Sequence, residues 1–225
     1  MSSGELRFAL PGGAQALFTA RVAGNMSSVA GEGAADAEQA RERLRAHIGV
    51  DTLARGYQVH GTVVERLDGP HEPGAQGRHA DGQATALNGV GAMVLTADCL
   101  PVALGSRGAV AMVHAGWRGL AAGVLENGVL ALRELGGQGK IVAVIGPGAG
   151  ACCYEVGPEV HAIFGEAHRE GKRIDLRAIA CARLAAAGVE DVVDVHSCTI
   201  CDERFFSHRR EGARAGRQAG VAWRS

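Results

Sequence analysis

The chain has 225 residues, which is enough for one large domain with a substantial core, and its 47% hydrophobic and 21% charged residues are typical of a globular protein. A formal net charge of -1 gives no general reason to expect binding to nucleic acid or to a membrane surface. No apolar run reaches the roughly 18 residues of a membrane span, and no signal peptide is evident at the N-terminus. We expect a cytoplasmic monomer with a single domain over residues 1–225.

The first half of the chain alternates between short strand patterns, polar loops and helices. The predicted elements are, in order, a strand region at 5–20, a small-residue loop at 24–36, a helix at 36–48, a Gly/Pro-rich loop at 69–82, apolar strand runs at 92–95 and 109–113, and a helix at 119–135. Asp36 is the expected N-cap of the first helix. Leu120, Val124, Leu125, Leu132 and Leu135 share one side of the last helix.

The second half continues this irregular alternation. The predicted elements are a buried strand at 140–146, a glycine-rich turn at 147–157, helices at 158–170 and 175–187, a strand at 191–198 and an arginine-rich tail that closes the chain. Because strands and helices do not alternate regularly, the pattern favours a mixed α/β (α+β) fold in which helices pack on mixed sheets.

Two strand patterns end in reactive side chains. Cys99, in "TADCLPV", follows the first apolar run, and His114, in "VHAGWRGL", follows the second. The pair could be a nucleophile with its base, two ligands of one metal, or a buried thiol beside a structural histidine. The flanking Asp98 and Pro101 indicate a strand end near the surface, where sites are often built.

His60, in "GYQVHGTVV", is a third candidate at the end of a strand. Two histidines and one cysteine from separate strand ends would suit an open catalytic zinc site, which has three protein ligands and a water. Thiolate and imidazole ligands favour zinc or copper over magnesium or calcium.

Other polar groups could serve an anion or a structural purpose. Arg118 lies at a predicted helix start after a glycine-bracketed turn, where it could bind an anion or simply be exposed. The six cysteines include a Cys198-x-x-Cys201 motif. Because one such motif lacks a second ligand pair, we interpret these two as buried or supporting thiols, with a redox pair as the alternative. The tail arginines could bind phosphate or form a solvated face.

Five motifs occur together and in order: "QVHG", "TADCLPV", "VHAGWRGL", "IGPGAGACCYEVG" and "FFSHRREGARAGRQAG". Over roughly residues 55–220 this series resembles the laccase-domain family, also called the polyphenol oxidase, peptidoglycan editing factor or purine nucleoside phosphorylase family. The resemblance implies one laccase-domain-type domain with a zinc or copper pocket, whose ligands are His60, Cys99 and His114.

The resemblance also implies substrate-binding residues. Arg21 matches the arginine of the family's N-terminal motif and, with Arg118, would hold substrate or phosphate. Asp81 matches an acidic position before the thiol strand, and either Asp81 or Asp98 would supply the acid for a deamination. The segment after Arg21 is several residues shorter than the family pattern, which affects the expected nucleoside preference. His208 stands where the family often has Tyr.

The function that the resemblance implies is phosphorolysis of adenosine, inosine, guanosine and methylthioadenosine, together with deamination of adenosine. The partners would then be a nucleoside and phosphate. One alternative is a Cys-His hydrolase or amidase that edits peptidoglycan precursors, with His60 orienting the imidazole. The other is a non-enzymatic metal-binding or redox module. Laccase chemistry would need several copper clusters, whereas the nine histidines are scattered along the sequence.

Overall fold

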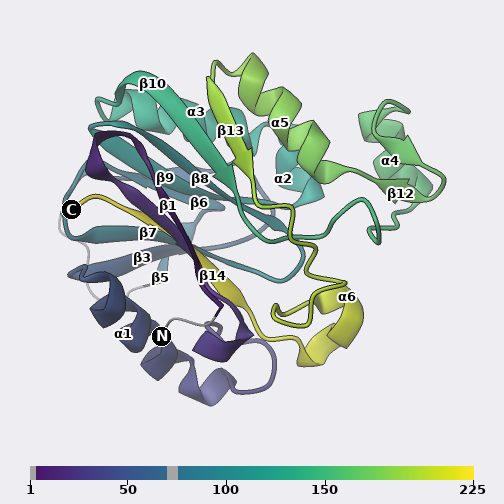
Figure 1. Cartoon of the computed structure of the whole chain (residues 1–225), viewed down its shortest axis with the longest axis horizontal. Coiled ribbons are helices and arrows are strands. Elements are labelled where there is room, and N and C mark those ends of the chain that lie inside the picture. The colour runs from purple at the N-terminus through teal and green to yellow at the C-terminus, as the bar shows by residue number, and fades with distance from the viewer. Residues whose placement is uncertain (1–3, 70–75) are drawn as a thin grey trace.

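Two six-stranded mixed sheets form the centre of the molecule in this computed structural model, which describes residues 4–69 and 76–225 (Figure 1). The first sheet contains, in spatial order, β1 (Leu6–Ala9), β2 (Gln15–Phe18), β14 (Gln218–Trp223), β7 (Val90–Thr96), β3 (Thr52–Tyr57) and β5 (Gln76–His79). The second contains β13 (Asp191–Asp194), β10 (Gln138–Ile145), β8 (Leu100–Arg107), β9 (Ala109–Ala115), β6 (Gly82–Thr85) and β4 (Val64–Leu67). A short hairpin joins β11 (Arg169–Glu170) to β12 (Arg173–Ile174).

The sheets pack on each other through small side chains. Ala16, Ala92, Ala103 and Ala222 lie between them with Phe18, all nearly inaccessible to solvent. Alanine at the sheet interface brings the two backbones close together, which explains why this alanine-rich, aromatic-poor composition still forms a dense core. Strand β9 is buried along its whole length, as its continuous apolar run predicts for a strand covered on both faces.

Helices cover the outer faces of both sheets (Figure 1). The described α-helices are α1 (Ala37–Ile48), α2 (Trp117–Ala122), α3 (Val124–Glu134), α4 (Pro158–Phe164), α5 (Leu176–Ala186) and α6 (His208–Glu211). Helix α1 packs on the first sheet, while α3 and α5 bury their apolar sides against the second. The prediction of a mixed α/β fold with helices packed on mixed sheets is therefore confirmed.

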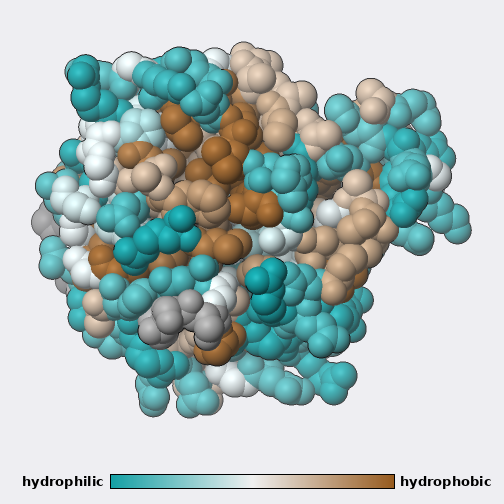
Figure 2. All heavy atoms as spheres, viewed as in Figure 1, coloured by the Kyte–Doolittle hydropathy of each residue, from teal (hydrophilic) through white to brown (hydrophobic). Residues whose placement is uncertain are grey.

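Apolar side chains also reach the surface beside the edge strands. Figure 2 shows hydrophobic atoms over β1, β10 and β13, whereas the projecting α4 segment is mostly hydrophilic. Leu6, Phe8 and Val142 are partly buried here against the intersheet core. Among the described residues, no helix combines the length and hydropathy needed to cross a membrane.

Two predicted helices are shorter than the sequence indicated. The helix predicted at 119–135 is broken into α2 and α3 at Gly123, whose φ of 99° lies in the left-handed region. The helix predicted at 158–170 ends at Phe164, because Gly165 adopts φ 70° and ψ −166° and the chain then enters β11.

Three further expectations need correction. The predicted loop at 69–82 contains β5, which pairs in parallel with β3, while residues 70–75 lie outside the described part of the chain. Asp36 occupies the N-cap of α1, but its side chain makes no capping bond because a 3-10 turn precedes the helix. The arginine-rich tail ends in β14, a fully buried strand between β2 and β7.

Candidate metal centre

The predicted cluster of His60, Cys99 and His114 forms at one edge of the two sheets. Parallel strands β3 and β7 end at the same edge, and His60 and Cys99 each follow three residues after their strand. His114 lies one residue before the end of β9, beside Pro101 of β8. One ligand atom from each of the three residues lies within 4.8 Å of the others.

The Asp81 carboxylate fixes the loop that carries His60. It accepts the backbone N–H groups of Val59, His60 and Gly61 at 3.1, 2.9 and 2.7 Å. His60 itself has φ 59°, a left-handed conformation that is uncommon for a residue with a side chain. The three hydrogen bonds to one fully buried carboxylate compensate for this strained turn.

The same carboxylate orients His114. Asp81 Oδ1 lies 2.8 Å from His114 Nδ1, so Nε2 is the imidazole nitrogen left for a ligand. Burial alone lowers the pKa of His114, but Cys99 and Asp81 outweigh it and raise the pKa to about 9. Burial raises the pKa of Asp81, but the hydrogen bonds from His114 and Gly61 leave it below its usual range. Asp81 is thus an anionic positioning group at neutral pH and a poor proton donor.

Cys99 is held as a thiolate. Its Sγ lies 3.8 Å from His60 Nε2. Burial raises the pKa of the thiol, but His114 and then His60 outweigh this effect and lower the pKa to about 6. Gly116 leaves the room that the cluster needs, since a Cβ there would lie 2.8 Å from His60 Cδ2 and 3.1 Å from Cys99 Sγ.

These residues fit a zinc or copper ion by the chemistry of their donors. Tetrahedral zinc with bonds of about 2.1 Å to nitrogen and 2.3 Å to sulfur holds those atoms about 3.6 Å apart, close to the 3.8 Å between His60 and Cys99. An aspartate behind a histidine ligand is the usual supporting arrangement in zinc sites. Three protein ligands would leave a fourth position for water or substrate.

A pocket of about 410 Å³ opens beside the cluster and includes all three residues in its lining. This volume is within the range of small-molecule sites. Arg55 and Arg217 also line it, and burial lowers the pKa of both guanidinium groups. His208 lines the pocket from the start of α6.

The shortened segment after Arg21 forms one wall of this pocket, through Ser27, Val29 and Ala30. Asn25 holds the segment in place. Its amide donates to the carbonyls of Ala30 and Glu32, and its Oδ1 accepts the backbone N–H of Arg217 at 2.8 Å. Sequence reasoning did not single out Arg55, and it noted Arg217 only as one of several tail arginines.

The remaining predicted site residues have other partners. Asp98 accepts the Thr199 hydroxyl and the Arg209 backbone N–H, both at 2.7 Å. Arg21 donates to Glu211 and lines a separate hollow of about 620 Å³. Arg118 is exposed, with its guanidinium 4.2 Å from the ring centroid of Trp117. Neither arginine lines the pocket beside the cluster, as far as the described residues define it.

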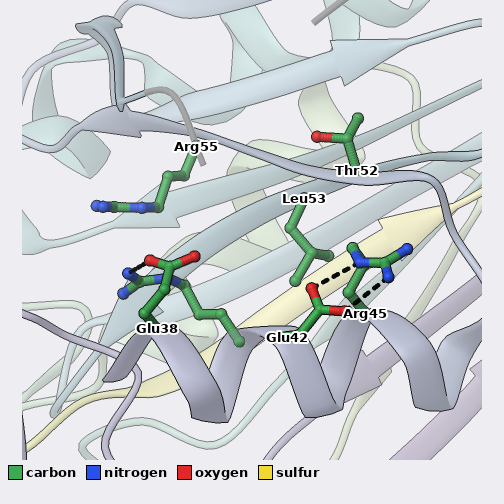
Figure 3. A pocket seen from close by; sticks show the side chains of 7 residues that line it. Glu38, Glu42, Arg45, Thr52, Leu53 and Arg55 are labelled. Atoms are coloured by element: carbon green, nitrogen blue, oxygen red, sulfur yellow. Dashed lines mark hydrogen bonds and ion pairs between the residues drawn. The ribbon is translucent and has the colours of Figure 1, made fainter. Parts of the chain in front are cut away.

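A smaller hollow of about 110 Å³ lies between α1 and β3 (Figure 3). Its acidic groups pair within the helix, Glu38 with Arg41 and Glu42 with Arg45. Arg55 lies on the Glu38 side of this hollow, away from Arg45, with no contact drawn to it (Figure 3). Both carboxylates of this hollow are thus already paired with arginines of the same helix.

The fold and the cluster together define a mixed α/β protein with an open site of two histidines and one cysteine. Residues 14–225 match the profile of a family described as "Multi-copper polyphenol oxidoreductase laccase", and the chain belongs to that family.

Named relatives support this membership. A Xylella fastidiosa (strain Temecula1) protein called "Purine nucleoside phosphorylase" is 40% identical over 233 residues, which cover 95% of this chain and 88% of the relative. An Escherichia coli (strain K12) protein called "Purine nucleoside phosphorylase YfiH" is 39% identical over 179 residues, with 74% and 72% covered.

Two crystal structures share the fold over almost the whole chain. YlmD from Geobacillus stearothermophilus has a TM-score of 0.88 at 28% identity and covers 100% of this chain and 97% of its own. A Neisseria meningitidis protein assigned to family DUF152 has a TM-score of 0.83 at 30% identity, with 99% and 100% covered. The two-sheet architecture is thus that of the family.

Proposed function

We propose that this chain is a metal-dependent purine nucleoside phosphorylase that acts on adenosine, inosine, guanosine and methylthioadenosine. The observation that carries the proposal is the His60, Cys99 and His114 cluster on the wall of a pocket lined by two half-buried arginines, Arg55 and Arg217. The names of the relatives agree with this activity. Zinc is the proposed metal and copper the alternative.

Phosphorolysis needs a site for an anion beside a site for a nucleoside. A phosphate oxygen attacks C1′ of the ribose, the bond from C1′ to the purine nitrogen breaks, and the base leaves with a proton. Arg55 and Arg217 are the two arginines that line the pocket, and a partly desolvated guanidinium binds phosphate through charge-assisted hydrogen bonds. We therefore assign the phosphate to these two arginines in place of Arg21 and Arg118, whose side chains lie elsewhere.

The chain's own residues prepare the metal site. Asp81 holds His114 and the His60 turn, so the ligands are fixed before substrate arrives. Zinc, when bound by His60, Cys99 and His114, would supply Lewis acidity to a substrate group or water in its open position. Zinc sites with histidine and cysteine ligands also serve nucleobase deaminases, and we include deamination of adenosine to inosine in the proposal.

Product analysis tests both activities. Zinc-loaded protein and its Cys99→Ala variant are incubated with adenosine, with and without phosphate, and the products are separated by chromatography. Adenine and ribose 1-phosphate that form only with phosphate demonstrate phosphorolysis, and inosine demonstrates deamination. We expect the Cys99→Ala variant to lose at least about 100-fold in rate, and Cys181→Ala, at a thiol outside the site, to keep the wild-type rate.

A cysteine hydrolase is the second candidate, and one observation favours it. Cys99, His114 and Asp81 form a thiolate–imidazolium–carboxylate series, with Asp81 as the group that orients the ring of His114. In this alternative the substrate is an amide, such as a peptidoglycan precursor, the three residues hold no metal, and His60 helps to orient the imidazole. Turnover of an amide by a metal-free sample would favour the hydrolase. Loss of nucleoside turnover in His60→Ala, together with loss of the metal held by this cluster, would favour the phosphorylase.

A further inference from the structure

Four cysteines outside the pocket come together from two loops. Cys152 and Cys153 lie in the glycine-rich turn after β10, and Cys198 and Cys201 lie in the loop after β13. Their sulfur atoms all lie within 4.8 Å of one another. The sequence shows only one Cys-x-x-Cys pair, and the structure supplies the second pair that this motif lacked.

The sheet explains why these loops meet. Strands β10 and β13 are parallel neighbours, with Ile145 opposite Asp194, so both loops leave from the same edge. The pairing continues into the loops, because Gly148 forms a parallel bridge with Cys198 and Thr199 N–H donates to the Gly148 carbonyl at 3.1 Å. Backbone hydrogen bonds beyond the strand ends thus hold the two loops together.

The distances between the sulfur atoms indicate one site that several thiols share. Cys201 Sγ lies 2.7 Å from Cys153 Sγ and 3.5 Å from Cys152 Sγ, so one thiol touches two others at once. A disulfide would join only one pair and leave the other sulfurs in contact with it. Tetrahedral zinc with bonds of about 2.3 Å holds its sulfur ligands about 3.8 Å apart. The sulfur–sulfur distance between Cys152 and Cys201 is already close to this spacing. The distance between Cys153 and Cys201 would increase by about 1 Å to reach it.

Backbone donors point at the first cysteine of the motif. Gly150 N–H donates to Cys198 Sγ at 3.2 Å, and a Cβ on Gly150 would lie 3.1 Å from Cys198 Cβ. The backbone N–H groups of Ile200 and Cys201 also face this sulfur. Hydrogen bonds from the backbone to sulfur are the usual support of a metal-bound thiolate.

We propose that Cys152, Cys153, Cys198 and Cys201 bind one structural zinc ion, separate from the His60, Cys99 and His114 site. Four thiols bind the ion as thiolates and release their protons. Four sulfur ligands close the coordination shell, which gives this ion a structural role and leaves no position for substrate. The ion would join the two loops on either side of Asp98, whose carbonyl accepts Ala149 N–H and whose carboxylate accepts the Thr199 hydroxyl.

Metal analysis of single variants tests this proposal independently of the enzyme's activity. Protein purified under reducing conditions without added chelator is assayed for bound zinc. We expect about two zinc ions per chain in the wild type and about one in either His60→Ala or Cys201→Ser. Cys181→Ser, which removes a thiol outside both clusters, should retain the wild-type content.

Cobalt substitution identifies the ligands of the remaining ion. His60→Ala loaded with Co²⁺ should show the absorption of a tetrahedral cobalt–thiolate site, and the double variant His60→Ala/Cys201→Ser should lose it. The proposal is overturned if His60→Ala binds no metal at Co²⁺ concentrations that saturate the wild type.

Mass spectrometry of unreduced peptides provides a second test. A Cys153–Cys201 disulfide in the freshly purified protein would also overturn the proposal. If nucleoside turnover fails while cobalt binds the four thiols, only the proposed function is refuted.

Discussion

At the scale of single residues, Asp81 positions two of the three candidate ligands, His60 and His114, although it is not itself a ligand. Its carboxylate receives three backbone N–H groups from the His60 turn and the Nδ1 of His114. The family resemblance implied a contact between Asp81 and substrate. The structure gives it the role of a positioning residue, because its side chain is fully buried behind the ligands.

Replacing this carboxylate should weaken metal binding. In Asp81→Asn, the side-chain amide keeps one oxygen that accepts hydrogen bonds. Its NH₂ group replaces the second carboxylate oxygen and would face the backbone N–H donors that this oxygen now accepts. We expect about 10–100-fold weaker zinc binding, as for the loss of other carboxylates behind histidine ligands. A zinc titration against a competing chelator measures this change. Asp191→Asn, at an exposed aspartate paired with Lys140, is the matched control, and equal zinc affinity in the two variants would refute the assigned role.

At the scale of elements, the site depends on where strands and helices end. The helix predicted at 119–135 is interrupted at Gly123, which serves as both the end of α2 and the cap of α3. The break lets α2 turn away after the His114 strand while α3 packs its apolar side on the second sheet. The sequence pattern cannot show this break. A glycine within a continuous helix and a glycine at a kink are the same residue, and only the φ angle distinguishes them.

Gly123→Ala should therefore destabilise the protein. A side chain at φ 99° costs about 1–2 kcal/mol in free energy of unfolding, whereas alanine in a continuous helix would be stabilising. Urea unfolding followed by circular dichroism measures the difference. Gly69→Ala, in open space and without a left-handed φ, should change the free energy of unfolding by less than about 0.5 kcal/mol. A more stable Gly123→Ala variant would indicate a continuous helix.

At the scale of the whole molecule, the two ends of the chain build one sheet and one side of the pocket. Strand β14 pairs with β2 and β7, and the segment before it contributes His208 and Arg217 to the pocket. Glu211 joins these ends because it pairs with Arg21 from the N-terminal region and Arg210 from α6. Arg21, which the family resemblance assigned to substrate, thus contacts the C-terminal segment.

This junction predicts a pH-dependent loss of stability. Burial raises the pKa of Glu211, but Arg21 and Arg210 outweigh it and leave the folded-state pKa below 4.5. The ionised form therefore stabilises the fold above about pH 4.5, and this contribution disappears as pH falls through the folded-state pKa. We expect Glu211→Gln to lower the free energy of unfolding by about 1–2 kcal/mol at pH 7, with a smaller difference from wild type at pH 4.

Unfolding curves at both pH values test this expectation. Glu170→Gln is the control, since Glu170 is 78% exposed in its pair with Arg173 and should contribute little. A Glu211→Gln deficit that is the same at pH 4 and pH 7 would show that the carboxylate charge is not responsible.

The sequence alone determined the class of fold and the identity of the clustered residues. Hydrophobic runs fix strands because burial depends on local pattern, and so β7, β9 and β10 were predictable. His60, Cys99 and His114 stood out because each follows or ends a buried run. The tertiary structure alone decided which distant groups meet: Asp81 behind His114, Arg55 and Arg217 at the pocket, and Cys152 and Cys153 beside Cys198 and Cys201. Strand order sets these contacts, and it depends on packing between residues far apart in the chain, which local patterns do not encode.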